Sequence, residues 1–214
     1  MQKLRNPGGN VSSPDEIQSA ASYFAILGRA ASSLDWNQID FIARILHRAY
    51  QHEKTTFLFG NGGSAALASH FACDLGKGTW IPGTKRFRAV ALTDNLPMLT
   101  AWANDSGYED IFAEQLRGLI QPDDVALAIS CSGNSRNVLK ALEVARDAAA
   151  VTIGLGGFDG GFMKSLCDTA LVVSSDNMQI IEDLHLSLAH CLFTLVRKQI
   201  LQGDLQKVVA AKAS

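Results

Sequence analysis

Residues 56–64 read TFLFGNGGS, a short apolar run that ends abruptly in a glycine-rich loop. The same pattern recurs along the chain: each mostly apolar run is followed by Gly, Ser, Asn or Asp and then by a helical pattern. This alternation is typical of a parallel sheet whose two faces are covered by helices. The strands predicted in this way are Thr56–Phe59, Phe87–Leu92, Val125–Ile129, Val151–Leu155 and Thr169–Val173.

Helical patterns occupy the intervals between the strands, and two amphipathic helices precede the first strand, within residues 16–52. Residues 1–14 are rich in Gly, Pro, Asn and Ser and are expected to form a mobile arm. Residues 15–214 are then expected to form a single α/β domain. The later helices are predicted at Ala65–Gly76, Leu96–Ala103, Glu109–Ile120, Arg136–Ala149, Gly161–Leu166 and from Met178 to Leu201.

Composition excludes several classes of protein. Of the 214 residues, 47% are hydrophobic, which is enough to build a core without disulfides, and the four cysteines show no CxxC spacing. With a net charge of −2 and no long apolar run, neither nucleic acid nor a membrane is an expected partner, and a cytoplasmic location is expected. Only 19% of residues are charged, below the roughly 25% of an average domain, which favours some surface being buried in an oligomer.

Two loops carry the pattern of an anion site. GNGGS (residues 60–64) and SCSGNS (residues 130–135) each join a strand to the start of a helix. Glycine lets backbone N–H groups approach an anion, and a helix N-terminus attracts negative charge. Neither loop matches a nucleotide-binding pattern, so a phosphate group on another molecule is the predicted ligand. The alternative is that both are tight turns in which serine caps the following helix.

Two helices carry candidate proton-transfer or metal-binding groups. His70 and Asp74 are four residues apart and therefore share one face of a helix, although such pairs are also common on solvated surfaces. The last helix carries Glu182, Asp183, His185 and His190 in an otherwise apolar segment, where buried polar groups need partners. One of its histidines could be a core residue. Glu182 and His190 are separated by about 12 Å along the axis, which limits how both could reach one ion.

Taken together, these motifs resemble a known family. GNGGS, HFACDL, LTDN, WANDSGYEDIF, ISCSGNSRNVLKAL, VTIGLGGFDGG and IIEDLHLSLAHCL occur in the order found in the SIS (sugar isomerase) domain, and within it in the phosphoheptose isomerases. The resemblance implies a flavodoxin-like three-layer sandwich with a five-stranded parallel sheet. It also implies a homotetramer with active sites at subunit interfaces. The implied reaction interconverts sedoheptulose 7-phosphate and D-glycero-D-manno-heptose 7-phosphate.

The resemblance assigns roles to individual residues. It implies one zinc ion per active site, held by His70, Asp74, Glu182 and His190, with Asp74 as the base and His190 as the second proton carrier. Zinc supplies the Lewis acid in this interpretation, although Mn or Ni also suits such a site. The residues expected to bind the substrate and its phosphate are Asn61, Gly62, Ser64, Asp105, Ser130, Cys131, Ser132, Ser135 and Glu182.

The chain departs from the family pattern at positions that matter. Asp74 stands where the family usually has Glu, and Glu182 stands where it has Gln. Cys131 replaces a Thr, which turns a hydroxyl donor into a weak thiol, and Gln179 occupies a position that is often acidic. Two other functions therefore stay open: an isomerase or epimerase of a different sugar phosphate, and a non-catalytic SIS protein that binds a sugar phosphate or a protein partner.

Overall fold

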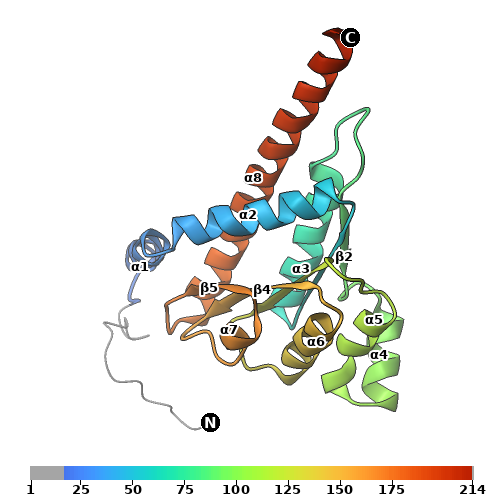
Figure 1. Ribbon diagram of the computed structural model, residues 1–214. Helices are drawn as coiled ribbons and strands as arrows, with labels where there is room; N and C mark the ends of the chain where they lie inside the picture. Colours follow the sequence, from blue (N-terminus) through green and yellow to red (C-terminus); the bar gives the residue numbers. More distant parts are fainter. Residues whose placement is uncertain (1–16, 214) are drawn as a thin grey trace.

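The computed structural model describes residues 17–213, with side chains described as far as residue 203. Its five strands form one sheet in the order β2-β1-β3-β4-β5, and every neighbouring pair is parallel (Figure 1). The predicted strands are confirmed to within two residues at each end. Their bounds are β1 Thr55–Gly60, β2 Arg88–Ala91, β3 Val125–Ser130, β4 Val151–Gly157 and β5 Thr169–Val173.

The helices follow the sequence pattern, with three differences in detail. The last helix extends twelve residues beyond the predicted end, and Asp74–Gly78 forms a π-helical turn (η2). The helix predicted over residues 109–120 is split into a 3₁₀ turn (η3, Tyr108–Asp110) and a short α5. The other bounds are α1 Ala20–Ser32, α2 Trp36–Gln51, α3 Gly63–Cys73, α4 Leu96–Asp105, α5 Ala113–Arg117, α6 Arg136–Asp147, α7 Met163–Leu166 and α8 Met178–Ala213.

The two N-terminal helices start where the sequence provides caps. Ser19 caps α1 through a reciprocal pair with Ser22, and the Asp35 carboxylate accepts from the backbone of Asn37 at the start of α2. The N-terminal helical pair is thereby confirmed, whereas the predicted arm, residues 1–14, lies outside the described residues. No helix among the described residues is long and apolar enough to span a membrane.

The sheet separates two hydrophobic cores. Leu58 of β1 points into a core shared with α1, α2, α3 and α8, whereas its neighbours Phe57 and Phe59 point into a second core with α5, α6 and Met163. This alternation is the two-residue period of a strand. Figure 1 shows α2 and α8 on one side of the sheet and α6 and α7 on the other, which is the expected three-layer sandwich.

The strand order defines where a ligand can bind. From β1 the chain crosses over to β2 at the edge, and from β3 it crosses in the opposite direction to β4. The loops that follow β1 and β3 therefore diverge, one into α3 and the other into α6, on opposite faces of the sheet. In open parallel sheets ligands occupy the crevice at this switch point, beyond the carboxyl ends of the strands. Both glycine-serine loops lie there.

Candidate active site

Both loops at the switch point depend on glycine. Gly62 adopts φ +56°, a conformation that side chains disfavour, at the N-cap of α3. Gly133 adopts φ +62°, and a Cβ there would lie only 2.0 Å from the carbonyl oxygen of Gly160. A side chain at Gly133 would thus push the second loop away from the loop that follows β4. Glycine at these positions keeps both backbones close to the crevice.

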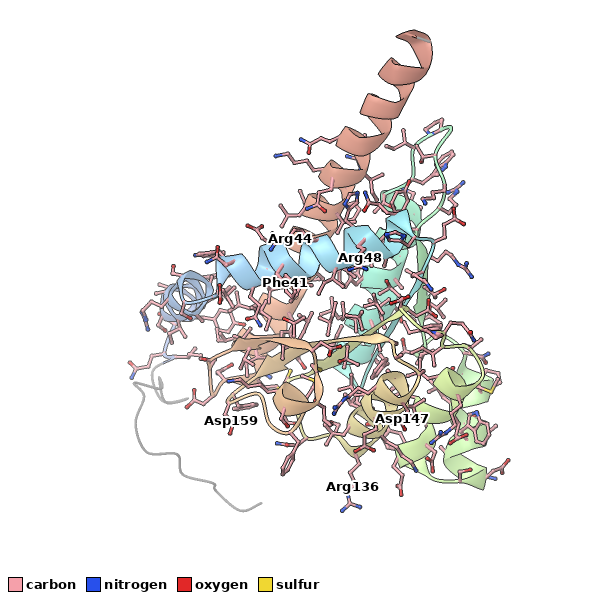
Figure 2. The ribbon with its side chains drawn as sticks, in the orientation of Figure 1. Phe41, Arg44, Arg48, Arg136, Asp147 and Asp159 are labelled. Carbon is pink, nitrogen blue, oxygen red and sulfur yellow. The ribbon has the colours of Figure 1, made fainter. Side chains whose placement is uncertain are left out.

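The start of α6 has free donors for an anion. Ser135 occupies the N-cap position, but its side chain makes no capping hydrogen bond. Among the described residues, the backbone N–H groups of Arg136 and Asn137 have no acceptor. These groups and the helix dipole form the kind of site that holds phosphate. The guanidinium of Arg136 points outward from the molecule (Figure 2), so the attraction to an anion comes from the backbone rather than from this cation.

The serines of the two loops lie at or just beyond the carboxyl ends of the neighbouring strands β1 and β3. Ser64, in the first turn of α3, and Ser130, at the end of β3, are buried, while Ser132 and Ser135 are partly exposed. The Ser130 hydroxyl accepts a hydrogen bond from the backbone N–H of Gly133, and the Ser132 hydroxyl accepts one from Asn134. These bonds shape the loop and leave both hydroxyl hydrogens free to donate to a ligand.

Asn137 and Tyr108, which were not among the predicted site residues, both bind the predicted residue Asn61. The amides of Asn61 and Asn137 form two reciprocal hydrogen bonds, 2.9 and 2.8 Å long. The hydroxyl of Tyr108 donates to Asn61 Oδ1 at 2.9 Å. The placement of Asn137 in the first turn of α6, next to SCSGNS, is the one local signal that could have pointed to it.

The predicted imidazoles and carboxylate meet at the C-terminal end of α3. Asp74 Oδ2 lies 3.5 Å from His70 Nε2 and 3.9 Å from His190 Nε2, and the two Nε2 atoms are 3.4 Å apart. Asp74 is the residue at which α3 passes into the π-helical turn. Such turns often occur at functional sites because they shift the direction of one side chain relative to its neighbours.

This group of three residues fits a metal ion. Their ligand atoms all lie within 4.8 Å of one another. Ligands about 2.0–2.2 Å from a tetrahedral zinc ion are themselves about 3.4 Å apart, close to the separations between His70, Asp74 and His190. Two imidazoles and one carboxylate also match the donor set of catalytic zinc sites, which keep a fourth position open for water or substrate.

Glu182 lies outside this group in the described structure. The helices α3 and α8 run side by side in the same direction, so a residue near the start of α8 lies beside the start of α3. Glu182 is next to Gly63 at the start of α3, where an added Cβ would be 2.9 Å from its Oε1, whereas His190 faces His70 seven residues further along α3. Glu182 as a fourth ligand stays a prediction, and it would require the side chain to reach along the helix.

Glu182 is instead a neighbour of the second loop. Burial, and then the charge of Glu182, raise the pKa of the Cys131 thiol, while a hydrogen bond with Ser64 lowers it. A cavity of about 280 Å³ opens between α3 and α8 at this point, and Ser64, His70 and Glu182 all line it. This cavity thus connects the first glycine-serine loop, through Ser64, with His70 of the histidine–aspartate group.

Other residues of the predicted clusters have separate environments. His185 is buried, and its Nε2 lies 2.9 Å from the carbonyl oxygen of Gly156, so it is a core histidine. Burial lowers the pKa of His185 and keeps it neutral. Asp183 accepts a 2.5 Å hydrogen bond from Tyr23 and thereby ties α8 to α1. Asp105, the last residue of α4, is exposed and its carboxylate accepts a hydrogen bond from Asn104.

Comparison with known proteins relates this site to a family. The SIS domain model matches residues 21–157. A phosphoheptose isomerase of Helicobacter pylori (strain P12) is 42% identical over 154 residues, covering 72% of this chain and 80% of the relative. One of Pelobacter propionicus is 36% identical over 185 residues, covering 86% and 95%.

Solved structures agree with the sequence comparison. The phosphoheptose isomerase of Francisella tularensis superimposes with a TM-score of 0.79 at 31% identity, covering 88% of this chain and all of that one. The enzyme of Neisseria gonorrhoeae gives a TM-score of 0.77 at 32% identity, covering 83% and 96%. Matches of this identity and coverage reach beyond a shared fold. The chain belongs to the phosphoheptose isomerase family of SIS-domain proteins.

Proposed function

We propose that this chain is an aldose–ketose isomerase that interconverts sedoheptulose 7-phosphate and D-glycero-D-manno-heptose 7-phosphate. Relatives that are similar to this chain over most of both sequences are named phosphoheptose isomerases. The observation that carries the proposal is the meeting of Asp74 with His70 and His190, where His70 lines a cavity that extends to Ser64 of the first loop. A carboxylate and an imidazole next to a phosphate site are what this isomerisation requires.

The reaction moves one proton between adjacent carbons and one between adjacent oxygens. The Asp74 carboxylate takes a proton from C1 of the ketose, and His190 supplies a proton to the oxygen on C2, which gives an enediol. His190 then removes the proton from the oxygen on C1, and Asp74 returns its proton to C2 to complete the aldose. Each acid–base group of this kind typically contributes 10²- to 10⁴-fold to the rate.

The phosphate end of the substrate needs no chemistry, only a fixed position. The hydroxyls of Ser64, Ser130, Ser132 and Ser135 and the free N–H groups at the start of α6 supply neutral donors to it. Asn61, Gly62 and Cys131 belong to the same two loops, and Asp105 is proposed to contact sugar hydroxyls. Holding the substrate at both ends brings the C1 proton to the carboxylate in a reactive geometry.

His70, Asp74 and His190 would hold a divalent ion, proposed to be one zinc per site, with Glu182 as a further candidate ligand. When bound, it supplies a positive charge that stabilises the negative oxygens formed during isomerisation. The donor set supports zinc but also accommodates manganese or nickel.

We further propose that the chain works as a homotetramer in the cytoplasm, with each site completed at a subunit interface. The side chains of His70 and His190 are 48% and 51% exposed in the single chain, more than is usual for groups that carry out proton transfer. Large apolar side chains are exposed on α1 and α2, including Phe24, Trp36 and Phe41. Sedimentation analysis of the purified chain, with and without sugar phosphate, tests the assembly.

The decisive experiment follows sedoheptulose 7-phosphate by NMR in the presence of the enzyme, before and after complete removal of metal. We expect the aldose signal to appear with the metallated enzyme, to be lost with chelator and to return with zinc. A panel of shorter ketose phosphates tests the alternative that the substrate is a different sugar. Asp74 favours this alternative because its side chain is one methylene shorter than the Glu usual in the family. A chain that binds sugar phosphates but converts none of them would be a non-catalytic SIS protein.

A further inference from the structure

Two asparagines link the phosphate loops across the switch point. Asn61 directly follows β1, and Asn137 is the second residue of α6, which follows β3. The chain leaves these strands toward opposite faces of the sheet, so the reciprocal bonds of 2.9 and 2.8 Å between the two amides join loops that otherwise diverge. Any displacement of one amide therefore affects the other loop.

The backbone determines which way each amide points. The N–H of Val138 donates at 2.9 Å to Asn137, and because an N–H can only donate, the atom it meets is Oδ1. Asn137 Nδ2 is then the donor toward Asn61, so the atom of Asn61 that faces it is Oδ1. The same oxygen accepts from Tyr108.

This arrangement leaves one donor unused. Asn61 Nδ2 gives one hydrogen to Asn137 Oδ1, and its second hydrogen has no acceptor among the described residues. Asn61 is partly exposed at the crevice, whereas Asn137 is only 3% exposed and cannot reach a ligand itself. The exposed amide can therefore bind, and the buried amide can only orient it.

We propose that Asn137 is a positioning residue: it holds the Asn61 amide so that its remaining N–H donates to the phosphate of the substrate. This inference rests on the proposed function for the identity of the substrate, but the phosphate it requires can be tested alone. A flipped Asn61 would present a carbonyl oxygen to the phosphate and repel it. Asn137 thus holds the Asn61 side-chain amide, which could otherwise flip, in the orientation that donates to the phosphate.

The test is a double-mutant cycle on the full chain. The variants are Asn61→Ala, Asn137→Ala and the two combined, and the measurements are the Kd for inorganic phosphate by calorimetry and the KM and kcat for sedoheptulose 7-phosphate. We expect each single variant to weaken phosphate binding and raise KM by about tenfold, as for a lost hydrogen bond to a charged group. kcat should stay within about twofold, because phosphate binding is uniform through the reaction. The double variant should be no weaker than either single one, since Asn137 acts through Asn61.

Two further variants keep the outcome interpretable. Asn95→Ala removes the cap of α4 without touching either loop, so it should lower the unfolding midpoint and leave phosphate affinity unchanged. Asn137→Asp keeps the acceptor for Val138 but loses the donor, and it replaces Asn137→Ala if that variant does not fold. We expect it to weaken phosphate binding as well.

Several outcomes would overturn the inference. One is an Asn137 variant with a lowered unfolding midpoint and an unchanged phosphate Kd, because this result would show that Asn137 has a purely structural role. Another is a double variant whose loss is the product of the single losses, and a third is a wild type that binds no phosphate. If the wild type binds phosphate but does not convert the heptose, the proposed function fails while the phosphate measurements still decide the role of Asn137.

Discussion

The Nε2 atoms of His70 and His190 lie 3.4 Å apart, although 120 residues separate the two histidines in the chain. At this distance the two ring nitrogens are close enough to form a hydrogen bond with each other or to bind one ion between them. Both face the Asp74 carboxylate, which lies within 3.9 Å of each. A shared cation or a shared proton resolves this arrangement, and either suits an isomerase.

Asp74→Asn should remove the proposed base while keeping a side chain of nearly the same size and shape. We expect the turnover of sedoheptulose 7-phosphate to fall by at least about 10²-fold, because an amide cannot accept the C1 proton, and the Kd for inorganic phosphate to stay unchanged. Steady-state kinetics and calorimetry measure the two effects. Asp147→Asn, at the outer end of α6 (Figure 2), is the matched control and should be fully active. An active Asp74→Asn enzyme would show that another group is the base.

Metal content should depend on the histidines that face Asp74. We expect one ion per chain in the wild type and a loss of both metal and activity in His70→Ala, measured by elemental analysis and by the visible spectrum of a cobalt-loaded sample. His52→Ala, at the C-cap of α2, is the control and should retain the ion. Unchanged turnover in a sample freed completely of metal would refute the metal-dependent part of the proposed function.

The serine loops should affect binding more than turnover. Ser64→Ala and Ser132→Ala each remove one hydroxyl donor, worth about 0.5–1.5 kcal/mol, so KM should rise by about two- to tenfold with kcat little changed. Ser165→Ala, an exposed serine of α7 whose hydroxyl bonds to Phe162, serves as the control. Variants that lose turnover at unchanged KM would place these serines in the chemistry instead of the phosphate site.

The Cys131 thiol should be protonated, and therefore slow to react, at neutral pH. Burial and the charge of Glu182 raise its pKa, so the pH midpoint of its alkylation should lie above the usual value of about 8.5. Glu182→Gln removes the charge and should lower that midpoint. The rates are measured by mass spectrometry of the Cys131 peptide, which separates it from the exposed Cys73 and Cys191. The same midpoint in both proteins would contradict a charge contact between Glu182 and Cys131.

His185 should make the fold less stable in acid. Its pKa is lowered by burial, so below about pH 6.5 the unfolded chain binds a proton that the folded chain does not, and the free energy of unfolding falls as pH falls. This contribution is absent above that pH and has a limiting slope of about 1.4 kcal/mol per pH unit. Urea unfolding of the metal-free wild type and His185→Gln between pH 7.5 and 5 measures it. Equal slopes would mean that His185 does not titrate differently in the two states.

Much of the fold was predictable because the relevant signals are local. Each apolar run became a strand, and the capping residues Ser19 and Asp35 start the helices that precede β1. The spacing of His70 and Asp74 predicted that their side chains share one helical face, and in the structure the two groups lie 3.5 Å apart. The π-helical turn that begins at Asp74 was not predictable, because Gly76 and Gly78 indicate that the helix is interrupted there but do not specify a π-helical turn.

The amino-acid sequence by itself determined the elements, the glycine-serine loops and the two helices that bear the reactive groups, since strand and helix periods depend on near neighbours in the chain. Tertiary structure alone decided which groups meet. Packing of α3 beside α8 sets how the helices are aligned, and this alignment brings His190 to Asp74 and leaves Glu182 near Gly63. Strand order likewise brought Asn61 to Asn137, because contacts between distant segments depend on how whole layers pack and not on local periodicity.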